Sequence, residues 1–147
     1  MNKTRVLFVC NQNSARSQIA EAFLNKLAGD RFEAHSAGLE AGQLHQLAVE
    51  VMREAGIDIS QNKTKKVFDL FKRGELFAYV IAVCDEATAQ KCPVFPGLMA
   101  DRMSWNIEDP ATYTGTHDEK MERMRKLRDA IKEKVVEFAK SLTEDIE

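Results

Sequence analysis

The chain has few cysteines and a small net charge. These two features argue against a disulfide-stabilised fold and against a polyanionic binding partner. Its 147 residues hold three cysteines and no Cys-x-x-Cys pair, which argues against a structural disulfide framework. A net charge of −2 gives no reason to expect nucleic acid or an anionic membrane surface as the partner. The three histidines stand apart, so no zinc site is expected, and no motif indicates a cofactor.

Long apolar runs are also missing from the sequence. No run approaches the roughly 18 residues of a membrane-spanning helix. The N-terminus, MNKTRVLFVC, has only a five-residue apolar run, which indicates a strand rather than a signal peptide, so we expect a cytoplasmic protein. Because no linker or low-complexity tract divides it, the chain is predicted to form a single domain over residues 1–147, and we expect a monomer.

Strand-like and helix-like patterns alternate along the chain. The predicted strands are Val6–Val9, Arg31–Ser36, Phe77–Val83 and a segment within Leu98–Trp105. The predicted helices are Ser17–Ala28, Leu44–Ala55, a short one over Lys63–Lys72 and a long one that begins at a Thr116/Glu119 capping box. Strands that alternate with helices predict an α/β fold of three layers, in which helices flank a parallel sheet.

A polar loop with a cysteine at its head separates the first predicted strand from the first helix. Cys10 ends the strand, the loop Asn11–Ala15 follows, and Arg16 and Ser17 open the helix. Backbone N–H groups at a helix N-terminus bind anions, and the same field favours the thiolate of a cysteine. The planar fork of Arg16 can pair with two oxygens of a tetrahedral oxyanion.

These residues form a candidate constellation for nucleophilic catalysis. Cys10 is the expected nucleophile, Ser17 can donate its hydroxyl to the thiolate, and Asn13 can brace the loop. The expected oxyanion-binding residues are Asn11, Gln12, Asn13, Ser14, Ala15 and Arg16. The alternative is a buried strand-end cysteine and a surface arginine, but the Cys-x5-Arg-Ser pattern between a strand and a helix favours catalysis.

Three polar segments follow predicted strands and should share one edge of the sheet. They are Cys10–Arg16, Ser36–Gly38 and Cys84–Pro93. Ligands of open parallel sheets bind beyond the carboxyl ends of the strands, so we expect the site at this edge.

The segment VCNQNSARSQIAEAF resembles the phosphate-binding loop of the low-molecular-weight protein tyrosine phosphatase superfamily. Within the superfamily, the chain is most similar to the thioredoxin-coupled arsenate reductases. Further segments that resemble the family are SAGLEA, EAGIDIS, VIAVCDEATAQKCP, WNIEDPA and RKLRDAI. The resemblance implies a central four-stranded parallel sheet flanked by helices.

The resemblance also implies a general acid in an Asp-Pro pair. Here that acid is Asp109, in Glu108-Asp109-Pro110, and Glu108 is a lesser candidate. Expelling an oxide or alkoxide from a tetrahedral centre is slow without a proton, which explains the need for an acid. Taken alone, an Asp-Pro pair is an ordinary turn signal.

The implied chemistry uses three thiols. Cys10 attacks arsenate, Cys84 attacks the adduct, arsenite leaves and a Cys10–Cys84 disulfide forms. Cys92 then attacks Cys84, and thioredoxin reduces the Cys84–Cys92 disulfide. Phosphate or sulfate would mimic arsenate in the loop. The alternative is that Cys84 is a core residue and Cys92 an incidental surface thiol, and the presence of the Cys10 loop argues against it.

Two other functions stay open at this point. The first is a phosphatase that hydrolyses phosphomonoesters through a Cys10 phosphocysteine, for which Cys84 and Cys92 are dispensable. Phosphatases of this fold tend to carry Tyr directly after Asp-Pro, whereas here Ala111 follows and Tyr113 comes later. The second is a non-catalytic oxyanion-binding module.

The sequence departs from the family in two places. Seven residues, 85 to 91, separate Cys84 from Cys92, where the family has six. A subset of the family binds potassium through Asn, Glu, Ser and Asp side chains. The first three positions are matched here by Asn13, Glu21 and Ser36. Lys65 or Lys66 stands where the Asp is expected, so we expect a lysine ammonium to replace the ion.

Overall fold

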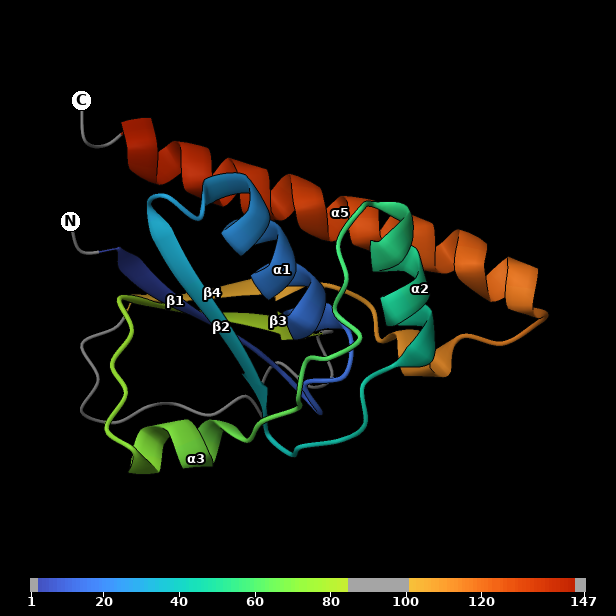
Figure 1. Ribbon diagram of the computed structural model, residues 1–147, viewed down its shortest axis with the longest axis horizontal. Coiled ribbons are helices and arrows are strands. Elements are labelled where there is room, and N and C mark those ends of the chain that lie inside the picture. The colour runs from blue at the N-terminus through green and yellow to red at the C-terminus, as the bar shows by residue number, and fades with distance from the viewer. Residues whose placement is uncertain (1–2, 85–100, 145–147) are drawn as a thin grey trace.

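Four parallel strands form a single sheet at the centre of the structure, a computed structural model that describes residues 3–84 and 101–144 (Figure 1). The strands are β1 (Thr4–Cys10), β2 (Phe32–Gly38), β3 (Tyr79–Cys84) and β4 (Asp101–Asn106). Their order in the sheet is β2-β1-β3-β4, and every neighbouring pair is parallel. The predicted fold class, a parallel four-stranded sheet flanked by helices, is confirmed.

Helices cover both faces of the sheet and complete the three layers. They are α1 (Arg16–Ala28), α2 (Gln46–Glu54), α3 (Val67–Lys72) and α5 (His117–Glu144). Figure 1 shows α1, α2 and α5 on one face and α3 on the other. In the part of the chain described, no helix is both long enough and apolar enough to cross a membrane.

The central strand β1 is apolar because both of its faces are buried. Val6 and Phe8 belong to the core cluster shared with α1, α2 and α5, while Leu7 and Val9 belong to a second cluster with α3. Neighbouring side chains of a strand point to opposite faces, so a strand covered on both sides needs an unbroken apolar run. This explains why the apolar run alone was enough to predict the strand.

The long helix α5 begins where the capping box predicted. The backbone N–H of Glu119 donates to Thr116 Oγ1 at 3.2 Å, and the Thr116 N–H donates to Glu119 Oε1 at 3.4 Å. The helix buries one apolar stripe against the sheet and α1. Its buried residues are Met121, Met124, Leu127, Ile131, Val135, Phe138 and Ala139.

Several predicted boundaries differ from the structure, and in two cases contacts with distant residues decide. Strand β2 does not end at Ser36 but continues through Ala37 and Gly38, which pair with Val9 and Cys10 of β1. Only the second half of Lys63–Lys72 is helical. Its first half runs extended, because the Lys65 carbonyl accepts from the Gly38 N–H at 2.8 Å. The first three residues of the predicted strand Leu98–Trp105 lie outside the described residues.

Candidate active site

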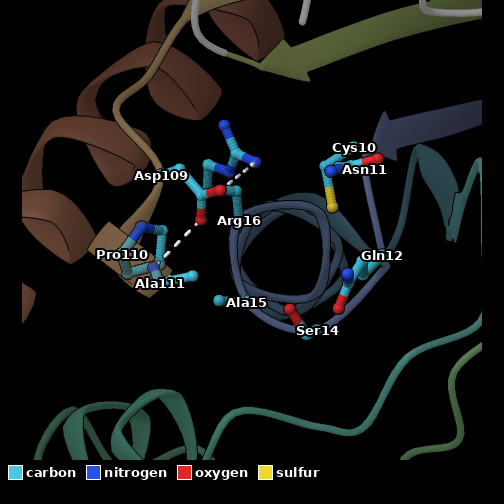
Figure 2. Close-up of a pocket in the computed structure, with 9 residues that line it drawn as sticks. All are labelled: Cys10, Asn11, Gln12, Ser14, Ala15, Arg16, Asp109, Pro110 and Ala111. Carbon is cyan, nitrogen blue, oxygen red and sulfur yellow. Dashed lines mark hydrogen bonds and ion pairs between the residues drawn. The ribbon is translucent and has the colours of Figure 1, made fainter. Parts of the chain in front are cut away.

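The carboxyl end of β1 opens into a small cavity of about 60 Å³. Two segments far apart in the sequence line it, as Figure 2 shows. The lining residues are Cys10, Asn11, Gln12, Ser14, Ala15, Arg16, Asp109, Pro110 and Ala111. The structure therefore places the predicted nucleophile loop and the predicted acid around one cavity.

The Cys10 thiol is buried and sits at the end of a short chain of hydrogen bonds. Cys10 Sγ lies 2.9 Å from Ser17 Oγ, and the Asn13 amide Nδ2 donates to the same Ser17 oxygen at 2.8 Å. Either group can donate in the contact between Cys10 and Ser17, but only the Ser17 hydroxyl can donate once the thiol has lost its proton. The structure thus places Ser17 within hydrogen-bond distance of the sulfur, and its predicted role as a donor to the thiolate stays a prediction.

Asn13 holds the loop in a left-handed backbone conformation, with φ of 56°. Asn tolerates this region better than most residues, but it still needs support from its surroundings. Asn13 Oδ1 accepts from the Lys65 N–H at 3.0 Å and from Gln18 Nε2 at 3.1 Å. The side chain of Asn13 does not line the cavity. It braces the loop from behind.

Gln18 completes this support, and sequence reasoning missed it. Its Nε2 also approaches the Lys63 carbonyl at 3.2 Å, and its Oε1 accepts from Asn62 Nδ2 at 3.0 Å. The side chain is fully buried. A glutamine in the first turn of the predicted helix, at a position that would face the core, was the available signal, because buried amides require hydrogen-bond partners.

Arg16 is not a surface charge, since only 3% of its side chain is exposed. Its guanidinium donates to the Ile107 carbonyl at 3.1 Å and lies 3.8 Å from Asp109 Oδ2. Figure 2 shows the guanidinium directed toward Asp109. The other carboxylate oxygen of Asp109 accepts from the Ala111 N–H at 3.0 Å. Arg16 thus links the loop of the predicted nucleophile to the segment that carries the predicted acid.

Glu108, the lesser candidate for the acid, is not among the residues that line the cavity. It accepts a hydrogen bond from the Tyr113 hydroxyl, and its other oxygen lies 3.6 Å from Arg123. Tyr113 is buried, so it cannot serve as an aromatic wall for a substrate. Burial and the Glu108 carboxylate raise the pKa of the Tyr113 phenol.

Cys84 ends β3 beside the strand that carries Cys10. It is 1% exposed, and its thiol donates to the Val9 carbonyl at 3.7 Å. Val9 directly precedes Cys10, so the two cysteines lie on neighbouring strands near one edge of the sheet. Cys92 lies outside the described residues, as do residues 85 to 91 between the two cysteines.

Among the residues that match a potassium site, Glu21 is influenced by the charge of a lysine. Burial raises the pKa of Glu21, and the positive charge of Lys65 opposes this shift. Of the two candidate lysines, Lys66 pairs with Glu40 at 3.4 Å, while the charge of Lys65 acts on Glu21. Ser36 and Asn13 are both buried, and the Asn13 amide is already engaged. The replacement of a potassium ion by a lysine ammonium stays a prediction.

The chain is similar to known proteins over nearly its whole length. Residues 5–147 match the family described as low molecular weight phosphotyrosine protein phosphatase. An arsenate reductase of Bacillus licheniformis is 40% identical over 142 residues, which cover 96% of this chain and 99% of that protein.

Two solved structures are similar at 29% identity. One is an arsenate reductase in a phosphate-binding state, with a TM-score of 0.71, 92% of this chain and 95% of that chain covered. The other is a thioredoxin-dependent arsenate reductase from Corynebacterium glutamicum, with a TM-score of 0.71, 97% of this chain and 63% of that chain covered.

Proposed function

Since the chain belongs to the low molecular weight phosphotyrosine protein phosphatase family, we propose that it is an arsenate reductase of that family, converting arsenate to arsenite. One observation carries the proposal beyond the likeness. The Cys84 thiol contacts the residue that precedes Cys10, beside a cavity large enough for a tetrahedral oxyanion. A phosphatase needs one cysteine, whereas a reductase must supply two electrons from a second thiol.

In the first step, the Cys10 sulfur forms a bond to arsenic and one arsenic–oxygen bond breaks. The departing oxygen takes a proton from Asp109 and leaves as hydroxide or water. Arg16 and the backbone N–H groups of the loop hold the remaining oxygens, whose charge is highest as the reaction proceeds. The buried position of Arg16 supports this role, because charge pairing is strongest where water is excluded.

Cys84 performs the second step. Its thiolate attacks Cys10 Sγ, a sulfur–sulfur bond forms, and the sulfur–arsenic bond breaks with its electron pair left on arsenic. Arsenic is thereby reduced from the +5 to the +3 state and leaves as arsenite. Cys92 then attacks Cys84, releases the Cys10 thiolate, and leaves a Cys84–Cys92 disulfide. A dithiol of the thioredoxin class reduces this disulfide and is itself oxidised to a disulfide.

The cavity favours a small inorganic oxyanion over an aryl phosphate. Ala111 occupies the place where an aromatic wall would stand, and the ring of Tyr113 is buried. Phosphate and sulfate should bind as mimics, because they share the shape and charge of arsenate. For the same reason we expect a weak side activity as a phosphatase.

The proposed chemistry also indicates where the protein works. Recycling by thioredoxin requires a reducing compartment, so we expect the protein to work in the cytoplasm. We also expect one domain over residues 1–147 that acts as a monomer, without metal, cofactor, nucleic acid or membrane.

Replacing Cys92 by serine tests the relay. In arsenate-dependent NADPH oxidation with thioredoxin and thioredoxin reductase, wild type should turn over continuously. Cys92→Ser should produce about one arsenite per protein and then stop, because the Cys10–Cys84 disulfide is no longer resolved. Unchanged turnover in the variant would contradict the relay. A wild type that hydrolyses phenyl phosphate but leaves arsenate untouched would be a phosphatase.

Potassium should not stimulate turnover. The positive charge of Lys65 already acts on Glu21, so replacing potassium chloride by choline chloride at constant ionic strength should leave kcat and KM for arsenate unchanged. The matched variant Lys65→Met removes this charge and keeps the length of the side chain. A clear rise in the wild-type rate with added potassium would show that the site takes the ion after all.

A further inference from the structure

A hydrogen bond closes the turn that carries Asp109. Glu108 and Tyr113 flank this turn, whose centre is the short 3-10 helix Pro110–Thr112, and the Tyr113 hydroxyl donates to Glu108 Oε1. The bond therefore joins the two ends of a six-residue segment, 108–113. Asp109 is the first residue inside it.

The closed turn is tied to the core on one side. Tyr113 is 6% exposed and belongs to the main hydrophobic cluster. The Arg123 guanidinium of α5 lies 4.1 Å from the centre of the Tyr113 ring. The Arg123–Glu108 ion pair is about half exposed on both sides and contributes little by itself. The buried ring of Tyr113 thus fixes the turn to the core. The Tyr113 hydroxyl in turn holds Glu108 through its hydrogen bond.

Asp109 needs such an anchor because its short hydrogen bonds are all made to residues of its own turn. Its Oδ1 accepts from the Ala111 N–H, and its carbonyl accepts from Thr112 Oγ1 at 2.7 Å. These bonds shape the turn but do not place the turn relative to Cys10. The contact with Arg16, at 3.8 Å, is longer than a hydrogen bond.

We propose that Tyr113 is a positioning residue, which holds Asp109 over the cavity through its hydrogen bond to Glu108. This role rests on the proposed function, in which Asp109 protonates the departing oxygen. Misplacing an acid by a fraction of an ångström weakens proton transfer without changing how the oxyanion is bound. Tyr113 therefore acts on kcat and not on KM. Glu108 is its anchoring partner and not the acid.

The hydrogen bond persists across the working pH range. Burial and the neighbouring carboxylate raise the pKa of the phenol, so Tyr113 keeps its proton and stays a donor.

The test is a double-mutant cycle between Tyr113 and Asp109. Tyr113→Phe keeps the ring and removes only the hydroxyl, and it should lower kcat for arsenate about fivefold, the effect of one lost hydrogen bond, with KM unchanged. In an Asp109→Asn background, the same change should have no further effect, because Tyr113 acts through Asp109. A merely structural role would lower kcat equally in both backgrounds and would overturn the proposal.

Tyr79→Phe is the matched control. Tyr79 is the only other tyrosine of the chain, and it packs edge-on against Phe138, away from the cavity. Removing the hydroxyl of Tyr79 should leave kcat for arsenate unchanged. At Glu108, Gln retains an oxygen that can accept from Tyr113, so Glu108→Gln should keep more activity than Glu108→Ala. Equal losses in the two Glu108 variants would overturn the anchoring role.

The cycle separates this proposal from the proposed function. If wild type fails to reduce arsenate with thioredoxin but hydrolyses phenyl phosphate, reductase activity is overturned, and the same four proteins are assayed for phenyl phosphate hydrolysis. Coupling between Tyr113 and Asp109 in that assay would still support the positioning role, and additive losses would overturn it. A wild type without either activity would overturn both proposals.

Discussion

Replacing Arg16 by lysine should lower kcat/KM for arsenate by about 10²- to 10³-fold, the effect of losing a preorganised donor to a developing oxyanion. The charge is kept, so the loss isolates the shape of the guanidinium. Arg16 is buried and donates to the Ile107 carbonyl while its remaining donors face Asp109 and the cavity. A lysine ammonium is a point charge and cannot satisfy a carbonyl and two oxyanion oxygens from one planar fork.

Steady-state kinetics with arsenate and equilibrium binding of phosphate would measure this effect. Arg53→Lys makes the same chemical change on the exposed surface of α2 and should leave both quantities unchanged. Phosphate should bind more weakly to Arg16→Lys, since the same donors hold it. A loss of less than tenfold would mean that Arg16 supplies only charge and that the backbone N–H groups of the loop carry the recognition.

Gly38→Ala should both destabilise the protein and disable the site, although Gly38 does not line the cavity. A Cβ at this position would lie 2.6 Å from the Asn13 nitrogen and 2.6 Å from the Glu40 carbonyl oxygen. Both are backbone atoms, so the Cys10 loop itself must move. Overpacking of this kind costs about 1–3 kcal/mol of unfolding free energy. A displaced loop can cost on the order of 10² in kcat/KM.

Urea denaturation and arsenate turnover of the same variant would test both effects. Gly56→Ala is the matched control, because Gly56 has a φ of +82° and nothing within 4 Å of its added Cβ. The control should lose about 1 kcal/mol through backbone strain and keep its activity. If Gly38→Ala lost stability but kept full turnover, the close approach of β2 would not be what shapes the Cys10 loop.

The sequence predicted the parts of this structure that depend on local pattern. The unbroken apolar run of β1 predicted a strand covered on both faces, and the Thr116/Glu119 pair predicted the start of α5. The Cys-x5-Arg-Ser pattern led to the cavity because its spacing and its place after a strand are both local features. The structure brings Cys10, Arg16 and Asp109 together, while their catalytic roles stay predictions.

The remaining features depend on contacts between residues far apart in the chain. Gln18 meets Asn62 and Lys63 across more than 40 residues, so no window of the sequence contains the network that supports Asn13. For the same reason the first half of Lys63–Lys72 is extended, although its composition suits a helix. The Tyr113–Glu108 bond spans only five residues, but the sequence does not show which of the turn's polar side chains face each other.

The place of α5 in the chain bears on how the protein is made. The nucleophile loop is among the first segments to leave the ribosome, whereas α5, which packs against α1 and carries Arg123, follows every other helix and strand. A nascent chain that lacks α5 exposes the apolar face of α1 and has no anchor on α5 for the turn of Asp109. Because domains of this size fold as units, thiol and acid meet only after synthesis has passed the last helix.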